Sequence, residues 1–257
     1  MRAAGHAVHQ AALPEEARHG TFVPPTIIEI AAVADLPGEV FGPVLHVLRY
    51  RREDMEAVVR SVNDTSFGLT FGVHSRIDET IDRAATASNA GNQYVNRNMI
   101  GAVVGVQPFG GHGLSGTGPK AGGPLYVQRL LSQRPPFEAP SGELVGPVGE
   151  RNLYTLRPKG AVLCIASDPQ RLKVQHELVR ITGNRVAIDE SDKDIAAVLF
   201  AGSAEDLTAL NRRLAERPGR IVPVHLEPYL RDLLFDEVSL SVNTAAAGGN
   251  ASLMAIG

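Results

Sequence analysis

The sequence has almost no cysteine, no long apolar run and little net charge. Cys164 is the sole cysteine among 257 residues, which excludes an internal disulfide and fits a reducing compartment. No uninterrupted apolar run reaches the ~18 residues of a membrane span, and the N-terminal segment lacks the apolar stretch of a secretory signal. The net charge of −3 gives no indication of a nucleic-acid partner. These absences predict a cytoplasmic α/β protein.

The first half of the chain shows patterns typical of strands and helices. Thr21–Ile30 is rich in β-branched residues and punctuated by prolines, which predicts an edge strand. Val44–Tyr50 alternates as a second strand does, and apolar residues at helical spacing predict a helix that begins near Met55. A further helix over Asp78–Asn89 and a strand over Gln93–Asn96 follow.

Glycine and proline divide the second half. They are dense over residues 101–124, which excludes regular secondary structure there, and the proline-rich segment Ser132–Val148 is the predicted domain boundary. Beyond it, strands and helices alternate, and this predicts a mostly parallel sheet with helices on its faces. The predicted elements are strands Ala161–Ala166, Ala196–Phe200, Ile221–Val224 and Val238–Val242, a helix over Gln170–Ile181 and a second helix capped by Ser203.

A weak internal echo links two segments of the chain. Tyr94-Val95-Asn96 precedes Gly101 by the same spacing with which Ser241-Val242-Asn243 precedes Gly248. Chance explains so short a match as well as a repeat does.

Two segments carry chemical patterns. In Glu39–Pro43 (EVFGP), a carboxylate that accepts ribose hydroxyls and a ring that packs on a planar heterocycle make Glu39 and Phe41 candidates for binding a flat ligand. The alternative is a capped turn with Phe41 in the core. In Asn96–Gly111, glycines leave backbone N–H groups unshielded, so the loop can hold a small anion, with Phe109 as an apolar wall. The alternative is a series of tight turns without a ligand.

The order of several motifs resembles the C-terminal third of the aldehyde dehydrogenase superfamily: GTFVPPTIIEI, EVFGPVL, SFGLTFGVHS, GNQYVNRN and QPFGGHGLSGTG. The longer string NRNMIGAVVGVQPFGGHGLSGTGPKAGGPLY is more specific. It resembles the L-glutamate γ-semialdehyde (Δ1-pyrroline-5-carboxylate) dehydrogenase module of bifunctional proline utilization A proteins. Residues 150–257 resemble the extra C-terminal domain of the long members of that family, so the resemblance covers nearly the whole chain.

The resemblance implies an α/β fold in three parts. Residues 1–132 form the trailing part of an aldehyde dehydrogenase catalytic domain, residues 133–149 a linker, and residues 150–257 a non-catalytic, Rossmann-like α/β module. That module has no G-x-G-x-x-G between strand and helix. The sequence SDPQRL, which follows its strand AVLCIA, cannot cradle a pyrophosphate.

The resemblance also implies roles for individual residues. In this NAD-dependent family, Glu39 bonds the nicotinamide ribose and Phe41 lies near the nicotinamide. Gly101 and Ala102 donate backbone N–H groups to the α-carboxylate of the substrate, L-glutamate γ-semialdehyde. Phe109 lines the aldehyde pocket.

The family's nucleophilic cysteine, general-base glutamate and NAD-binding loop lie upstream of the EVFGP motif. Only 38 residues precede Glu39 and none is a cysteine, so no catalytic residue is assigned and the chain alone is predicted to be inactive. Cys164 stands in a predicted buried strand without an adjacent basic residue and is expected to be inert. His6 and His9 lie in an irregular segment, so no metal site is expected.

Two functions fit these patterns. In the first, the chain is part of an enzyme that oxidises L-glutamate γ-semialdehyde to L-glutamate in proline catabolism, with FAD expected only on a proline dehydrogenase portion outside this chain. In the second, the chain is a non-catalytic module that packs against the remainder of the dehydrogenase domain and caps its substrate channel. A homo-oligomer is compatible with both.

The C-terminal segment Val238–Gly257 carries no charged side chain. A free terminus normally carries polar residues. This tail is therefore expected to dock in a groove. The resemblance implies that the groove is the dehydrogenase substrate channel near the loop at 101–111, which the tail would seal. The alternative is that it completes the core of the small domain.

Overall fold

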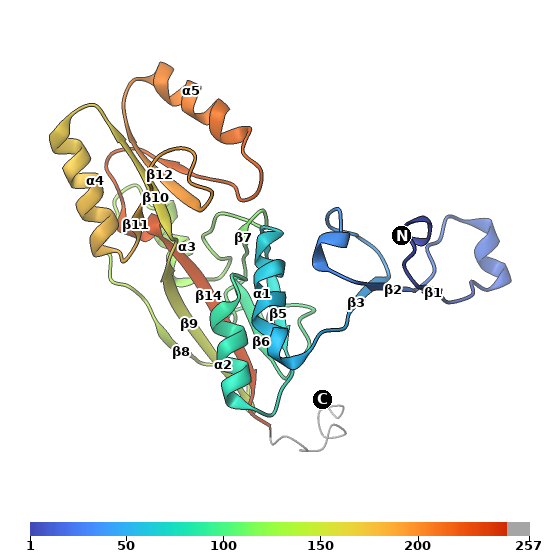
Figure 1. The fold of residues 1–257 in the computed structure, drawn as a ribbon. Coiled ribbons are helices and arrows are strands. Elements are labelled where there is room, and N and C mark those ends of the chain that lie inside the picture. The colour runs from blue at the N-terminus through green and yellow to red at the C-terminus, as the bar shows by residue number, and fades with distance from the viewer. Residues whose placement is uncertain (246–257) are drawn as a thin grey trace. The chain divides into compact units, whose positions relative to one another are not determined.

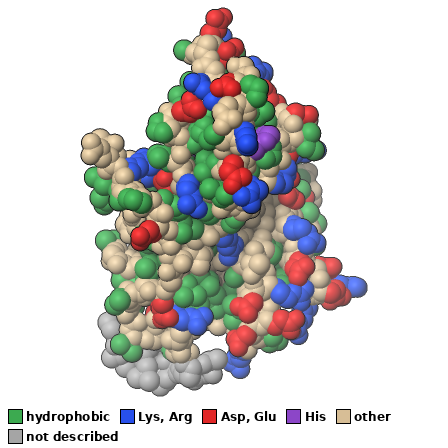
Figure 2. Space-filling model, turned by 90° about the vertical axis from the view of Figure 1, so that its left-hand side faces the viewer, with side chains coloured by type: hydrophobic (Ala, Val, Ile, Leu, Met, Phe, Trp, Pro, Cys, Tyr) green, Lys and Arg blue, Asp and Glu red, His purple; other side chains and the backbone are tan. Residues whose placement is uncertain are grey.

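A computed structural model describes residues 1–245, so most of the predicted tail lies outside the described residues. The chain divides into two compact units, Met1–Thr65 and Ser66–Gly257, and each is described by itself. Within the described residues, no helix is long and apolar enough to cross a bilayer. Acidic and basic side chains are interspersed over the face drawn in Figure 2.

The first unit is built on a three-stranded sheet. β2 (Thr26–Ile30) lies in the middle, antiparallel to β1 (Val8–Gln10) and parallel to β3 (Val44–Leu48), as Figure 1 shows. The predicted edge position of this strand is therefore wrong. Pro24 and Pro25 precede the paired residues rather than interrupt them, so each residue of β2 keeps its N–H for pairing.

The predicted helix of the first unit is confirmed as α1 (Met55–Asp64), with Met55 and Val59 buried. Its apolar residues recur at helical spacing, and Glu56 stands in the first turn, where the helix dipole favours negative charge. Four short 3-10 helices complete the unit: Arg2–Ala4, Glu15–His19, Val33–Asp35 and Arg52–Asp54.

The second unit contains a parallel sheet with helices on its faces, as predicted, but the predicted strand Val238–Val242 is not part of it. Its strands run in the order β11 (Arg185–Val186), β10 (Ala161–Ala166), β12 (Ile195–Ala201) and β13 (Val224–His225), all parallel. Two helices cover it, α4 (Pro169–Ile181) and α5 (Ala204–Ala215). The predicted cap is also confirmed, because the Ser203 hydroxyl accepts a hydrogen bond from the Asp206 N–H at 3.1 Å.

The buried strands place successive side chains on opposite faces of the sheet, so that α4 and α5 each pack against a separate hydrophobic cluster. Leu163 and Phe200 face one way and pack with Leu210 of α5. Their neighbours Val162 and Leu199 face the other way and pack in the cluster that includes Leu178 and Val179 of α4. Because successive side chains of a strand point to opposite faces, two helices can bury both sides of one sheet.

A second sheet in this unit is mixed and joins distant parts of the sequence. Its strand order is β5 (Thr70–Val73), β6 (Asn92–Val95), β14 (Phe235–Asn243), β9 (Glu150–Pro158) and β8 (Gly142–Leu144). β14 is parallel to β6 and antiparallel to β9, and Figure 1 shows it between them. The remaining elements are β4 (Phe67–Gly68), α2 (Asp78–Ala87), β7 (His112–Gly113), α3 (Pro124–Leu130) and the 3-10 helix Arg231–Leu234.

This sheet crosses the predicted domain division. β5 and β6 belong to residues 1–132, β9 and β14 to residues 150–257, and β8 to the predicted linker 133–149. The division of the chain at residues 133–149 stays a prediction. The backbone pairing shows that strands from both sides of this division share one sheet within the second unit.

The two segments of the internal echo are neighbours in this sheet. Tyr94 pairs with Ser241 and Val95 with Val242, in parallel register. The amide of Asn243 donates to the Asn96 carbonyl at 3.2 Å, which continues the register beyond the paired residues. Similar residues therefore occupy equivalent positions on adjacent strands.

Gly91, which immediately precedes β6, lies where two backbone segments approach each other closely. A Cβ at this position would stand 2.2 Å from the Gly110 carbonyl oxygen. We expect Gly91→Ala to lower the free energy of unfolding of the chain by about 1–3 kcal/mol, as overpacking does. Gly101→Ala is the matched control, since a Cβ there would meet no atom within 4 Å. Equal stabilities of the two variants in urea denaturation would refute the close packing.

Candidate functional site

The glycine-rich loop leaves β6 through a fixed turn. Asn96 adopts a left-handed backbone with φ 55°, a conformation that asparagine tolerates better than most residues. Its side chain accepts from the Ser75 N–H and donates to the Ser75 carbonyl, both at 2.9 Å. The strand therefore ends at a defined residue, and the loop begins in a defined direction.

The first part of the loop, Gly101–Val106, is termed the anchor loop. The Val103 carbonyl accepts from the N–H groups of Val106 and Gln107 at 3.1 and 2.9 Å, and the Gln107 side chain accepts from the Val103 N–H at 2.8 Å. Gly101 is exposed and Ala102 is half-buried. Within residues 1–245, neither of their N–H groups has an acceptor, so two adjacent amides are available to a ligand.

Phe109 lies at the far end of the same loop. It pairs with Ala121 through two backbone hydrogen bonds of 3.0 and 2.8 Å, and its side chain is half-buried. The next carbonyl, that of Gly110, accepts from the Lys120 ammonium at 2.7 Å. These bonds fix the backbone that carries the ring.

Lys120 is a buried lysine at the base of the loop, only 1% exposed. Its Nζ also donates to Asn92 Oδ1 at 2.9 Å, and its backbone N–H donates to the Glu237 carboxylate at 2.8 Å. Burial lowers the pKa of Lys120 to about 7, against the opposing effect of Glu237 and Asp236. The same Glu237 accepts from the Tyr154 hydroxyl at 2.7 Å.

His112 ties the loop to two carbonyl groups. Its Nδ1 lies 3.0 Å from the Asn89 oxygen and its Nε2 lies 3.1 Å from the Glu237 oxygen. Burial lowers the pKa of this imidazole, although Asp236 opposes the effect. The imidazole is therefore part of the packing between the loop and β14.

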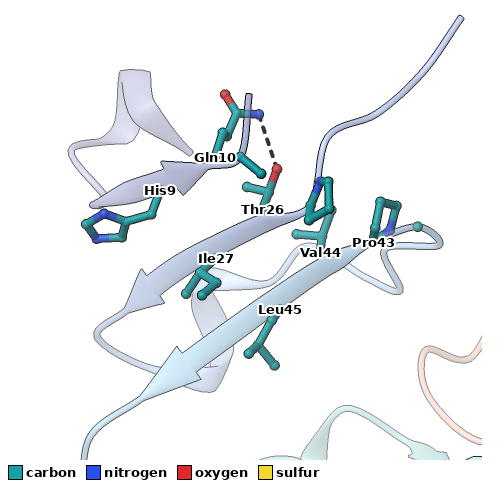
Figure 3. A pocket seen from close by; sticks show the side chains of 10 residues that line it. His9, Gln10, Thr26, Ile27, Pro43, Val44 and Leu45 are labelled. Carbon is teal, nitrogen blue, oxygen red and sulfur yellow. Dashed lines mark hydrogen bonds between the residues drawn. The ribbon is translucent and has the colours of Figure 1, made fainter. Parts of the chain in front are cut away.

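The residues of the EVFGP motif lie in the first unit. Glu39 is exposed, and Phe41 is 93% exposed rather than buried in the core of that unit. The turn that follows borders an open groove along β1, β2 and β3. Figure 3 shows the groove, where the Gln10 amide donates to the Thr26 hydroxyl at 3.2 Å. Both motif side chains are thus accessible.

Cys164 sits on β10, partly buried against the cluster that includes α4 residues. Burial raises the pKa of its thiol to about 11, so little thiolate exists near neutral pH. Among residues 1–245, no group of three or more His, Cys, Asp or Glu side chains could hold a metal ion.

The protein-family model described as "Aldehyde dehydrogenase family" matches residues 2–134. The chain belongs to the aldehyde dehydrogenase family. Bifunctional protein PutA of Rhizobium meliloti is 43% identical over 332 residues, covering 100% of this chain and 27% of that protein. The 1-pyrroline-5-carboxylate dehydrogenase of Bacillus thuringiensis is 43% identical over 110 residues, covering 42% of this chain and 21% of the relative.

The solved structure of proline utilization A from Corynebacterium freiburgense superposes with a TM-score of 0.71. It is 25% identical, and the match covers 93% of this chain and 29% of that one. The predicted α/β fold class and the predicted similarity to proline utilization A proteins are confirmed. This aldehyde dehydrogenase family chain spans about a quarter of the length of the bifunctional relative.

The buried lysine provides a test of the geometry. We expect Lys120→Met to lower the free energy of unfolding by about 1–3 kcal/mol, because the buried Asn92 Oδ1 loses its donor and the Gly110 carbonyl loses one of its two donors. Between pH 7 and 10.5, Lys120 is mostly deprotonated in the folded state but still protonated in the unfolded state, so the free energy of unfolding of the wild type rises with pH. The difference in stability between the wild type and Lys120→Met should therefore grow over this range. Urea denaturation at both ends of this window measures it. A difference that shrinks with pH would contradict the assignment.

Proposed function

We propose that the chain is the substrate-binding C-terminal part of an NAD-dependent dehydrogenase that converts L-glutamate γ-semialdehyde to L-glutamate in proline catabolism. One observation carries the proposal: the two adjacent unpaired amides of Gly101 and Ala102, in a loop whose shape is held by hydrogen bonds. The names of the relatives, PutA and 1-pyrroline-5-carboxylate dehydrogenase, support the same substrate.

The loop suits an aldehyde that carries a carboxylate at its other end. Two backbone N–H groups can donate to a carboxylate without the desolvation of a buried lysine or arginine. The Phe109 ring, fixed by its backbone bonds to Ala121, supplies an apolar wall for an aliphatic stem. The distance from these two amides to the site of hydride transfer would then determine which length of aldehyde fits.

Glu39 and Phe41 are proposed to bind NAD, which supplies the hydride acceptor when bound. Their exposure in the first unit fits this role, since an accessible carboxylate can accept ribose hydroxyls and an accessible ring can pack against a nicotinamide. The thiol nucleophile and the general base are proposed to come from the remainder of the dehydrogenase domain. FAD is proposed to belong to a proline dehydrogenase portion, and the whole protein is proposed to be cytoplasmic.

A second function concerns residues 150–257. We propose that this part is non-catalytic and serves assembly, because its strands β9 and β14 continue the sheet begun by β5 and β6. The segment after strand β10 has no glycine-rich phosphate loop, which agrees with a structural role. We also propose that residues 133–149 form the linker that precedes this part.

Ala102→Pro in a complete enzyme containing this chain tests the amide anchor. Proline removes one N–H donor, so we expect the KM for the semialdehyde to rise at least about tenfold, the loss of a bond to a charged group. Ala102→Gly, which keeps the N–H, is the control. Aldehydes without a carboxylate should lose much less. Equal losses for both kinds of aldehyde would point to general loop damage instead.

The 257-residue chain by itself should not reduce NAD with the semialdehyde. Its single thiol has a pKa of about 11, so a thiolate nucleophile is scarce at neutral pH. NADH absorbance against a blank without protein measures this. Turnover that disappears in Cys164→Ser would show that Cys164 is the nucleophile.

A further inference from the structure

The buried side chain of Gln107 holds the anchor loop through hydrogen bonds, and this arrangement is termed the Gln107 brace. Gln107 is 5% exposed, and its carbonyl accepts from the Val103 N–H at 2.8 Å. Its amide donates to the Glu150 carboxylate and, at 3.2 Å, to Asn152 Oδ1. The acceptor and both donors of this side chain are thus used in one arrangement, which locks its orientation.

The partners of Gln107 stand on β9, in the C-terminal part of the chain. Asn152 Oδ1 is held in turn by the Ser241 hydroxyl of β14 at 2.7 Å. Glu150 pairs with Arg97 at 2.5 Å, and the two side chains are only 15% and 16% exposed. The brace therefore runs from two strands of the mixed sheet, through one glutamine, to the backbone of the anchor loop.

Arg97 balances a charge that would otherwise disfavour an anionic ligand. Glu150 places a carboxylate in contact with Gln107, the side chain that holds the anchor loop. Unpaired, this charge would repel a substrate carboxylate at the Gly101 and Ala102 amides, and partial burial would weaken its screening by salt. The Arg97 guanidinium neutralises it and also lies over the Tyr94 ring, 5.2 Å from its centroid.

We propose that Gln107, Glu150 and Arg97 are positioning residues that set the preference of the anchor loop for aldehydes bearing a carboxylate. This inference rests on the proposed function of the loop. A glycine-rich backbone loses much conformational entropy when it orders around a ligand. The Gln107 brace orders the loop in advance, so that ligand binding does not bear that cost. Residues 150–257 thereby influence substrate choice without touching the substrate.

Gln107→Met keeps the bulk of the side chain and removes its hydrogen bonds. In hydrogen–deuterium exchange of the 257-residue chain, we expect faster exchange of peptides that span the anchor loop. In the complete enzyme, the KM for the semialdehyde should rise about tenfold, with kcat nearly unchanged and the KM for propanal changed less than about twofold. Glu143→Gln, an exposed carboxylate on β8, is the control and should behave as wild type.

A charge cycle tests the role of Arg97. Arg97→Met leaves Glu150 unpaired and should raise the KM for the semialdehyde about threefold at low ionic strength, with a smaller effect in salt. Glu150→Gln removes the charge but keeps an acceptor oxygen for the Gln107 amide, so it should not raise the KM. The double variant should return to within about twofold of wild type. Equal KM values for Arg97→Met and the double variant would refute the charge balance.

These experiments distinguish failure of the positioning role from failure of the proposed function on which it rests. If the complete wild-type enzyme does not oxidise the semialdehyde, the proposed function fails, while the exchange measurement still tests the brace. If it does oxidise the semialdehyde and Gln107→Met leaves both exchange and KM unchanged, the positioning role is wrong. Equal KM increases for the semialdehyde and propanal would also overturn it, because they would indicate loss of structure rather than of anion preference.

Discussion

The pairing of β14 between β6 and β9 is the interaction on which the second unit depends. Nine residues of β14 pair antiparallel with β9, and its C-terminal half also runs parallel to β6. The strand brings together segments that are far apart in the sequence. Without it, the side chains of β9 and β14 that hold the loop after β6 would not lie beside that loop.

The face of β14 that meets the loop is polar and buried. Glu237, Ser239 and Ser241 alternate along the strand, and each is at most 5% exposed. Each side chain has a defined partner: Glu237 accepts from the Lys120 backbone, Ser239 donates to the Pro108 carbonyl and Ser241 donates to Asn152. Because a buried polar group without a partner is costly, the bonds of Glu237 and Ser239 favour one register of the loop against β14. The register in turn positions the anchor loop and Phe109.

Local periodicity predicted helices α1, α2, α4 and α5 and strands β10 and β12 correctly, since those elements bury one stripe or alternate faces. Val238–Val242 was wrongly assigned to the parallel sheet, because it belongs to β14 in the mixed sheet. The predicted strand Ile221–Val224 overlaps β13 only at Val224. Strand β9 was not predicted, because its sequence ERNLYTLRP mixes polar and apolar residues without a clean pattern. The prolines of Thr21–Ile30 favoured an edge strand, but they precede β2, and β1, which shows no periodicity, pairs with it. The glycine-rich loop was recognised as a candidate anion site from its composition. Gln107 was not, because an uncharged residue between Val106 and Pro108 gives no signal of its own.

The sequence by itself determined the family motifs, the candidate residues Glu39, Phe41, Gly101, Ala102 and Phe109, and the parallel α/β core, because motifs and hydrophobic periodicity are local. Only the tertiary structure decided how the loop is held. Gln107 lies 43 residues from Glu150, and Lys120 lies 117 residues from Glu237. Such polar partners meet only after non-local strand pairing closes the intervening chain. The sequence distance between such partners follows no regular period, so their hydrogen bonds could be identified only from the folded structure.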